Sequence, residues 1–152
     1  MKISNNFDLK EVVCKRIYTQ YSERSIWFVT PWMINTLQSI RNYFGVPVEV
    51  NTWWKNGGNK QYRGHRPYDC PEGAPNSFHK MSLAVDFDVI GKDSIEVYNE
   101  IIKNHVKIGL DITTIESGTN GWNHVGNRNI DPGFREKFDY RFKNGLFIIE
   151  RR

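Results

Sequence analysis

An apolar segment that contains two carboxylates constrains the fold of this chain most strongly. Residues 83–90 read LAVDFDVI, and this run of apolar and β-branched residues predicts a buried strand. Alternation along a strand directs Asp86 and Asp88 to the same face. A buried carboxylate needs a partner that offsets the cost of its desolvation. The fold must therefore bring cations, hydrogen-bond donors or a metal to this face of the strand.

Two histidines are placed to meet this strand. His79 precedes it, in a loop that can fold back over the carboxylate face, and His124 lies in residues 121–125, which predict another strand. Two imidazoles and one carboxylate, with a fourth position left for water, are the usual protein ligands of a catalytic zinc. The sequence therefore predicts that His79, Asp86 and His124 bind Zn²⁺. Asp88 remains the substitute ligand, or an acceptor that orients a ligand histidine.

The surrounding residues resemble a known family. Residues 73–86, GAPNSFHKMSLAVD, resemble the S-x-H-x-x-G-x-A-x-D signature of the zinc D-alanyl-D-alanine carboxypeptidases and their phage endolysin relatives. In that family the third ligand is a histidine on a later strand, commonly beside a tryptophan, as in Trp122-Asn123-His124. The likeness extends from about residue 48 to residue 128. It implies the hedgehog-like D,D-peptidase fold, a zinc cofactor and a peptidoglycan substrate.

The resemblance also implies roles for residues around the metal. Ser77 matches a serine that contacts substrate, although it can equally cap a turn. Residues 63–67, RGHRP, resemble the family's arginine-bearing S-G-Y-R segment. Arg66 fits that arginine best, and Arg63 is the alternative; either would bind the peptide's carboxylate or stabilise the oxyanion at the attacked carbonyl. We assign Trp122 to substrate binding with them.

The chain departs from the family pattern at four positions. Ser82 replaces a glycine three residues after the first ligand. Gly121 and Trp122 occupy the positions where relatives usually carry the general base. Many phage relatives also have an aspartate where this chain has Gly126. The metal ligands are therefore complete, whereas the base must be sought elsewhere.

Glu116 is the candidate for that base. It is the only acidic residue between Asp111 and His124, and it ends a predicted strand just before the turn that leads into His124. A carboxylate there would take a proton from metal-bound water and pass it to the leaving amine. The alternative is an exposed glutamate of a turn.

The remaining pattern predicts one α+β domain over residues 1–152. Helices are expected at 30–44, where Thr30 caps the helix, and at 93–104, where Asp93 and Glu96 form a capping box, with a short helix within 7–14. Strands are expected at 46–53, 83–90, 109–115, 121–125 and 146–150. Together they predict a largely antiparallel central sheet with flanking helices. The long loop 55–77, rich in Gly, Asn, Pro and Arg, ends at the first ligand and is expected to form one wall of the substrate cleft.

Composition limits the compartments and partners. The 21 Lys and Arg exceed the 17 Asp and Glu by only four and are scattered, which argues against nucleic-acid binding. No apolar run approaches the roughly 20 residues of a membrane helix, and the N-terminus has no apolar core of a signal peptide. The two cysteines, Cys14 and Cys70, fit free thiols of a reducing cytoplasm, with a disulfide left open.

These observations together predict a monomeric zinc metallopeptidase that acts on bacterial cell-wall peptide. With no signal peptide, we expect it in the host cytoplasm until phage-mediated lysis delivers it to the wall. The bond that is cut, by a carboxypeptidase or by an endopeptidase, stays open. The alternative function is a zinc-binding or cell-wall-binding domain that kept the metal and lost the base.

Overall fold

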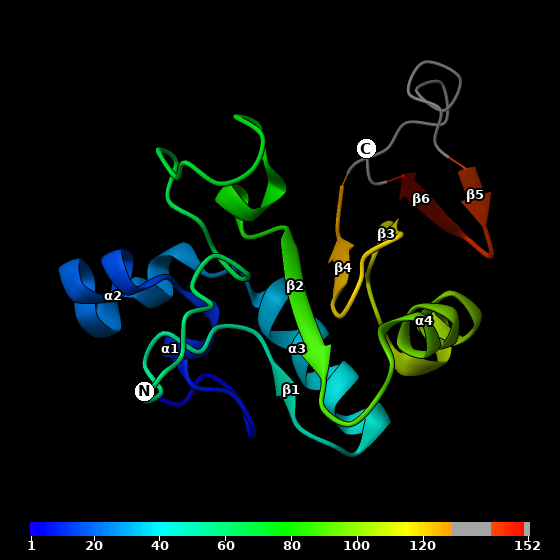
Figure 1. The fold of residues 1–152 in the computed structure, drawn as a ribbon, viewed down its shortest axis with the longest axis horizontal. Coiled ribbons are helices and arrows are strands. Elements are labelled where there is room, and N and C mark those ends of the chain that lie inside the picture. The colour runs from blue at the N-terminus through cyan, green and yellow to red at the C-terminus, as the bar shows by residue number, and fades with distance from the viewer. Residues whose placement is uncertain (129–140, 151–152) are drawn as a thin grey trace.

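A six-stranded sheet organises the part of the chain that the computed structural model describes, residues 1–128 and 141–150 (Figure 1). Its strands are β1 (Val48–Glu49), β2 (Ala84–Val89), β3 (Thr114–Ser117), β4 (Asn123–Gly126), β5 (Arg141–Lys143) and β6 (Leu146–Glu150). They lie in the order β1-β2-β4-β3-β6-β5. Among these six strands only β3 and β6 pair in parallel. The predicted α+β class and largely antiparallel sheet are confirmed.

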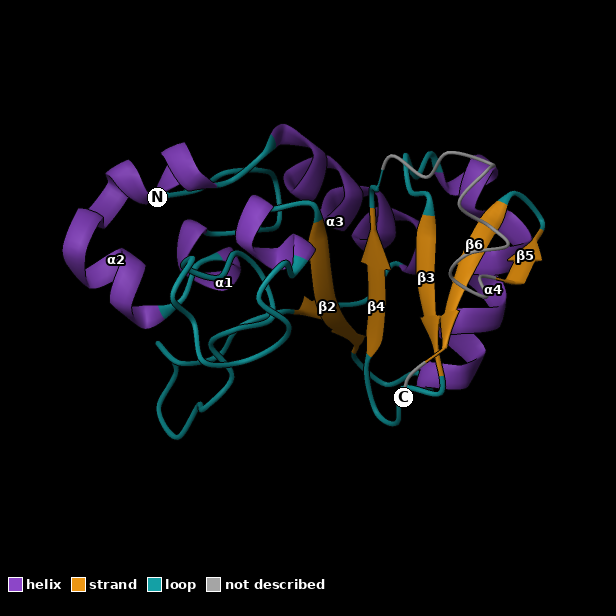
Figure 2. Ribbon diagram, turned by 90° about the horizontal axis from the view of Figure 1, so that it is seen from above, coloured by secondary structure: helices purple, strands orange, loops and turns teal. Residues whose placement is uncertain are grey.

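Two long helices, α3 (Pro31–Phe44) and α4 (Ser94–Ile108), cover one face of this sheet (Figure 2). The shorter helices α1 (Leu9–Val12) and α2 (Lys15–Tyr21) and the 3₁₀ helix η1 (Ser22–Phe28) gather beyond the β1 edge (Figure 1). A second 3₁₀ helix, η2 (Phe78–Met81), immediately precedes β2. Among the described helices, none has the length and apolar character that a membrane crossing requires.

The long helices form where their caps and apolar stripes predict them. The Thr30 hydroxyl accepts the Met33 N–H at 3.3 Å, and the Asp93 carboxylate accepts the N–H groups of Ile95 and Glu96. Each helix ends at a glycine in the left-handed region, Gly45 and Gly109. The second helix runs four residues beyond the predicted end at 104, because its buried stripe continues to Ile108.

The strand predictions were close for β2 and β6, whereas β4 begins two residues after the predicted 121 and β1 and β3 are much shorter than predicted. Residues 146–150 form β6 as predicted, and β2 is one residue shorter at each end than 83–90. The predicted strand 46–53 is reduced to two residues, because the backbone of Asn51 and Thr52 bonds instead to Glu11 and Lys60. The predicted strand 109–115 was wrong over its first five residues, since β3 begins only at Thr114.

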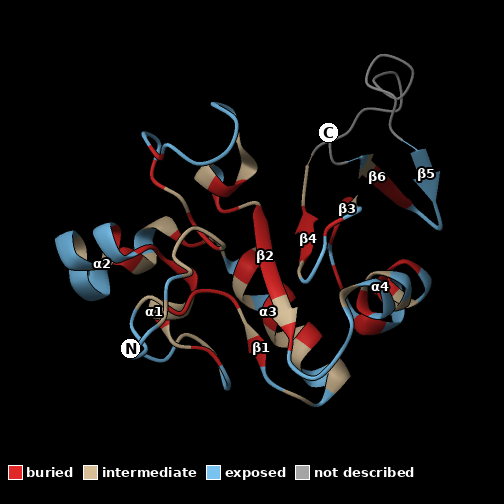
Figure 3. Cartoon of the chain, in the orientation of Figure 1, coloured by how far each residue is buried: buried red, intermediate tan, exposed pale blue. Residues whose placement is uncertain are grey.

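Alternation along β2 separates the core from the candidate site. Val85 and Phe87 are fully buried in the hydrophobic core with residues of α3 and α4. Most of β2 is coloured as buried in Figure 3. Asp86 and Asp88 therefore point to the opposite face. On that face the side chains of the loop before η2 meet the strand, because Arg66 donates to Asp86 at 3.0 Å and Arg63 donates to Asp88 at 2.6 Å. The polar face of β2 is thus covered by loop rather than by helix.

Candidate metal centre

His79, Asp86 and His124 form a buried cluster on this polar face. One donor atom from each lies within 4.8 Å of the other two. Asp86 and His124 are direct partners across the antiparallel pair β2–β4, whereas His79 comes from η2. Each of the three residues is no more than 6% exposed. The structure thus brings together the three residues predicted as metal ligands.

The hydrogen bond of His79 defines which nitrogen faces the cluster. Its Nδ1 lies 2.9 Å from the Gly64 carbonyl oxygen, which can only accept, so Nδ1 carries the proton. The unprotonated Nε2 lies 3.3 Å from Oδ1 of Asp86. Burial lowers the pKa of His79 and outweighs the attraction of Asp86. The ring is therefore held in the neutral form, with its lone pair directed at the cluster, as a metal ligand requires.

Asp86 is held in its ionised form. Its Oδ1 accepts a hydrogen bond from Nδ1 of His124 at 2.6 Å. Burial opposes the charge, but the hydrogen bond from His124 favours it, and the pKa of Asp86 stays below the ordinary aspartate value. A buried carboxylate with two facing imidazoles is thus available at neutral pH.

The donor set fits a zinc ion. Two ligand atoms each about 2.1 Å from a tetrahedral zinc lie about 3.4 Å apart. The distance of 3.3 Å between Nε2 of His79 and Oδ1 of Asp86 matches this spacing. The 2.6 Å between His124 and Asp86 is that of a hydrogen bond, so a metal would displace the proton on Nδ1 and widen this pair.

The two loop arginines bind different aspartates of β2. Arg66 donates from Nη2 to Oδ2 of Asp86 at 3.0 Å, whereas Arg63 donates from Nη1 to Oδ2 of Asp88 at 2.6 Å. Lys60 also binds Asp88, at 2.6 Å. Asp88 therefore pairs with cations of the loop. No hydrogen bond to His79 or His124 appears among its contacts in the described residues, as an acceptor for a ligand histidine would make.

Glu116 lies on the neighbouring strand at the edge of the cluster. Its Oε2 is 4.0 Å from Nδ1 of His124, the nitrogen that faces Asp86, and its side chain is 18% exposed. The register of β3 against β4 accounts for this closeness, because Ile115 pairs with Val125 and continuing the antiparallel register by one residue brings Glu116 opposite His124. Glu116 is thus a strand residue beside the cluster rather than an exposed residue of a turn.

The two glycines that depart from the family pattern have structural reasons. A Cβ at Gly126 would lie 2.7 Å from the Thr114 hydroxyl oxygen on β3 and 3.3 Å from the Leu83 carbonyl. An aspartate there would have to push the Thr114 side chain aside and would press on the Leu83 carbonyl. Gly121 adopts φ +81 in the turn before β4, a conformation that an L residue adopts only with strain. Neither position can readily carry a carboxylate in this backbone.

Ser82 stands where the resembled signature has a glycine, and its backbone has a conformation that glycine adopts readily. Its φ is +55 and ψ +30, in the left-handed region. Its buried hydroxyl donates to the Phe28 carbonyl and accepts from Nδ1 of His65 at 2.9 Å. These bonds tie η2, which carries His79, to η1 and to the loop.

A hollow of about 380 Å³ opens beside Asp86. The loop lines it from Asn59 to Arg63 and at Arg66 and Glu72, and Trp122 lines it from the turn before β4. The ring of Trp122 also meets His124 edge-on, with centroids 6.4 Å apart.

Ser77 is outside the lining of this hollow and lies near Gly73. Lys60 and Glu72 were missed from the sequence, where no motif distinguishes them from other charged loop residues.

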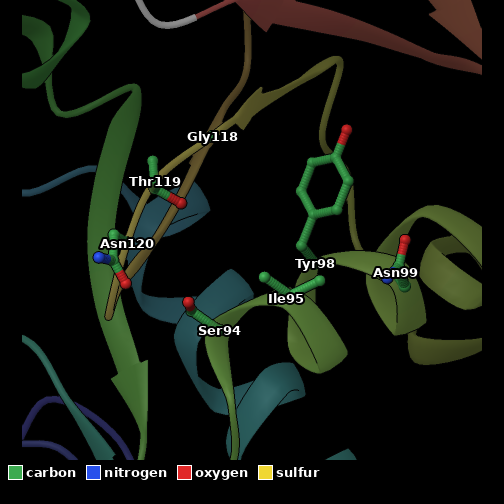
Figure 4. Close-up of a pocket in the computed structure, with 7 residues that line it drawn as sticks. All are labelled: Ser94, Ile95, Tyr98, Asn99, Gly118, Thr119 and Asn120. Carbon is green, nitrogen blue, oxygen red and sulfur yellow. The ribbon is translucent and has the colours of Figure 1, made fainter.

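A second hollow of about 370 Å³ lies between the first turns of α4 and the turn after β3 (Figure 4). Ser94, Ile95 and Tyr98 line it from the helix, and residues 118–120 line it from the turn. Its lining offers hydroxyl, amide and apolar groups, without an imidazole or a carboxylate. The metal-ligating chemistry of the described residues is therefore at the first hollow.

The chain matches none of the protein-family models, curated proteins or solved structures with which it was compared.

Proposed function

We propose that this chain is a zinc-dependent peptidase that cleaves the peptide stems of peptidoglycan. The observation that carries the proposal is the buried His79–Asp86–His124 cluster beside an open polar hollow. Three N and O donors with a solvent-reachable side are the usual make-up of a catalytic zinc site, whereas structural sites are closed by four protein ligands. The S-x-H and A-x-D pattern adds the substrate class, through resemblance alone.

The residues around the cluster have distinct roles in this proposal. A bound zinc would acidify a water molecule and polarise the scissile carbonyl. Glu116, 4.0 Å from His124, is close enough to the cluster to accept the proton of that water and return it to the leaving amine. Trp122 and the loop cations lining the hollow would hold the peptide. Ser77 does not line the hollow, so it would contact substrate only if the loop moves when substrate binds.

The expected fold family, oligomeric state and cellular location belong to the same proposal. A hedgehog-like D,D-peptidase fold is consistent with the antiparallel β2–β4 pair that places Asp86 opposite His124. A monomer that waits in the host cytoplasm and reaches the cell wall during phage lysis remains our expectation from the resemblance.

Digestion of purified peptidoglycan tests the proposal. The protein should release new muropeptide ends, identified by mass spectrometry. A chelator should abolish the release, and stoichiometric zinc should restore it. His124→Ala should be inactive, whereas His105→Gln, which changes a buried histidine of α4 outside the cluster, should remain active. Absence of cleavage by zinc-loaded wild-type protein on every wall peptide would refute the peptidase function.

A zinc-binding domain without catalysis is the second candidate. It is favoured by Gly121 and Gly126, which occupy the positions where relatives carry acidic residues. In that case the protein would bind zinc and cell wall without cleaving it. Sedimentation with intact cell walls, measured beside the digestion, separates the two functions.

A further inference from the structure

The two carboxylate oxygens of Asp86 have separate partners. Oδ1 faces both histidines, 2.6 Å from Nδ1 of His124 and 3.3 Å from Nε2 of His79. Oδ2 accepts instead from Nη2 of Arg66 at 3.0 Å. One oxygen therefore belongs to the metal cluster and the other to a cation outside it.

Arg66 is itself held in place from several sides. Its Nε donates to the Tyr62 carbonyl, and its backbone N–H donates to the His79 carbonyl at 3.1 Å. The loop backbone at Gly73 passes so close that a Cβ there would lie 2.6 Å from Nη1 of Arg66. The Arg66 side chain is 12% exposed. The guanidinium is thus packed against Asp86 rather than extended into solvent.

We infer that Arg66 is a positioning residue that reserves Oδ2 of Asp86, so that Asp86 offers a metal ion Oδ1 alone. Carboxylates can bind a metal through one or both oxygens. Chelation through both would occupy the coordination position that a catalytic zinc leaves to water. Arg66 would thus keep that position open. The inference rests on the metal site of the proposed function but not on its peptidase activity.

Arg63 provides a matched control for this role. It comes from the same loop, lines the same hollow and binds an aspartate on the same face of β2, two residues from Asp86. Its side chain is 19% exposed, close to the 12% of Arg66. Its partner Asp88, however, is outside the metal cluster. Removal of Arg63 changes the charge of the hollow without freeing an oxygen of a metal ligand.

Cobalt substitution measures the coordination number directly. Co²⁺ in a four-coordinate site absorbs visible light strongly, and the bands weaken when a fifth ligand atom binds. We expect Arg66→Met to weaken the bands severalfold, because Asp86 would then bind through both oxygens, while Arg63→Met keeps the wild-type spectrum. Arg66→Lys should retain most of the intensity, since an ammonium can still donate to Oδ2. Gly73→Ala keeps the guanidinium but would place a Cβ 2.6 Å from its Nη1, at a backbone φ of +82 that already strains an alanine, and should show part of the loss.

X-ray absorption of the zinc-loaded proteins provides the second readout, with one more oxygen neighbour expected in Arg66→Met. A wild-type spectrum in Arg66→Met overturns the inference, as does an equal change in Arg63→Met, which would reveal a general effect of charge. If Arg66→Met does not fold, the test rests on Gly73→Ala alone, and a wild-type spectrum of that variant overturns the inference.

A wild-type protein that binds no metal refutes the proposed metal site as well. A protein with the expected spectra but without cleavage refutes only the peptidase.

Discussion

Asp86 illustrates how one buried carboxylate is kept charged in this molecule. Its desolvation is offset by two donors, Nδ1 of His124 to Oδ1 and Nη2 of Arg66 to Oδ2. Loss of any single partner leaves the charge less compensated, and breaking a buried pair in this way typically costs about 3–5 kcal/mol. A metal ion would replace the His124 hydrogen bond by a stronger contact. Asp86 thus has a structural role in the apo protein beside the ligating role that we propose.

Glu116→Gln tests the proton-transfer role at the residue scale. The amide keeps the size of the side chain on β3 but cannot accept the proton, and general acid–base catalysis typically contributes about 10²–10⁴-fold. We expect turnover of wall peptide to fall by about that factor, with zinc content and melting temperature unchanged. Glu96→Gln, on the exposed face of α4, is the control that should keep full turnover. Near-normal turnover in Glu116→Gln would make Glu116 a bystander.

The sequence predicted the ligands of the cluster but not their supporting contacts. His79, Asp86 and His124 were recognisable because residue type and spacing match a known signature. The Gly64 carbonyl that orients His79 is a backbone group, which any residue could supply. The contact of Arg66 with Asp86 depends on how the loop folds over β2, and no local pattern encodes that path.

At the scale of elements, η2 is the segment on which the placement of His79 depends. It is a single 3₁₀ turn of four residues, too short to be stable by itself. Ser82 ends it in the left-handed region and bonds through its hydroxyl to Phe28 and His65. The position of His79 therefore depends on hydrogen bonds to η1 and the loop rather than on helix propensity.

Paired substitutions of Ser82 should separate backbone strain from hydrogen bonding. Both Ser82→Ala and Ser82→Gly leave the Phe28 carbonyl and the His65 N–H without their partner, at a cost of about 1–3 kcal/mol. Only glycine relieves the left-handed conformation, which is worth about 1–2 kcal/mol. Chemical denaturation should therefore find both variants less stable than wild type and the glycine variant about 1 kcal/mol more stable than the alanine variant. An alanine variant as stable as the glycine variant would contradict strain at Ser82.

The buried contact between Ser82 and His65 predicts that the stability of the fold depends on pH. Burial lowers the pKa of His65 to about 4, with a smaller contribution from His79. Between this value and about 6.5 the unfolded state binds the proton and the folded state does not, so stability falls as the pH falls through this window. From pH 7.5 to pH 5 the loss through His65 is about 2 kcal/mol.

Urea denaturation of the chelated protein at these two pH values measures this loss. His79, whose pKa is also lowered, contributes in the same direction. We therefore expect His65→Asn to flatten the pH dependence by about 2 kcal/mol rather than to abolish it. An unchanged pH dependence in His65→Asn would show that His65 is protonated in the folded state or already neutral in the unfolded one.

Elements with strong local signals were predictable, and those decided by distant contacts were not. α3 has a capping threonine, a proline at its first position and a terminating glycine, all legible in the sequence. β1 was overestimated because residues 50–53, VNTW, include β-branched and aromatic residues typical of a strand but bond to α1 and the loop instead. α2, η1 and β5 lack a clear apolar period and were missed for that reason.

At the scale of the whole molecule, the metal cluster joins segments that are far apart in the chain. His79 and His124 are separated by 45 positions and come from η2 and β4, with Asp86 on β2 between them. α3 and α4 fix this sheet from the opposite face (Figure 2). The cluster exists only when the loop, the central strands and the helical layer are assembled. Metal affinity and global folding are therefore linked.

Zinc should accordingly raise the stability of the entire fold. At a free zinc concentration 100 times the dissociation constant, the linkage contributes about 2.7 kcal/mol, which for a chain of this size raises the melting temperature by roughly 5–10 °C. We expect this shift between chelated and zinc-loaded wild-type protein in a thermal melt. His124→Ala should lose the shift, because two ligands bind zinc far more weakly than three. His105→Gln, which leaves the cluster intact, should keep it. An equal shift in His124→Ala would mean that zinc stabilises the protein from a different site.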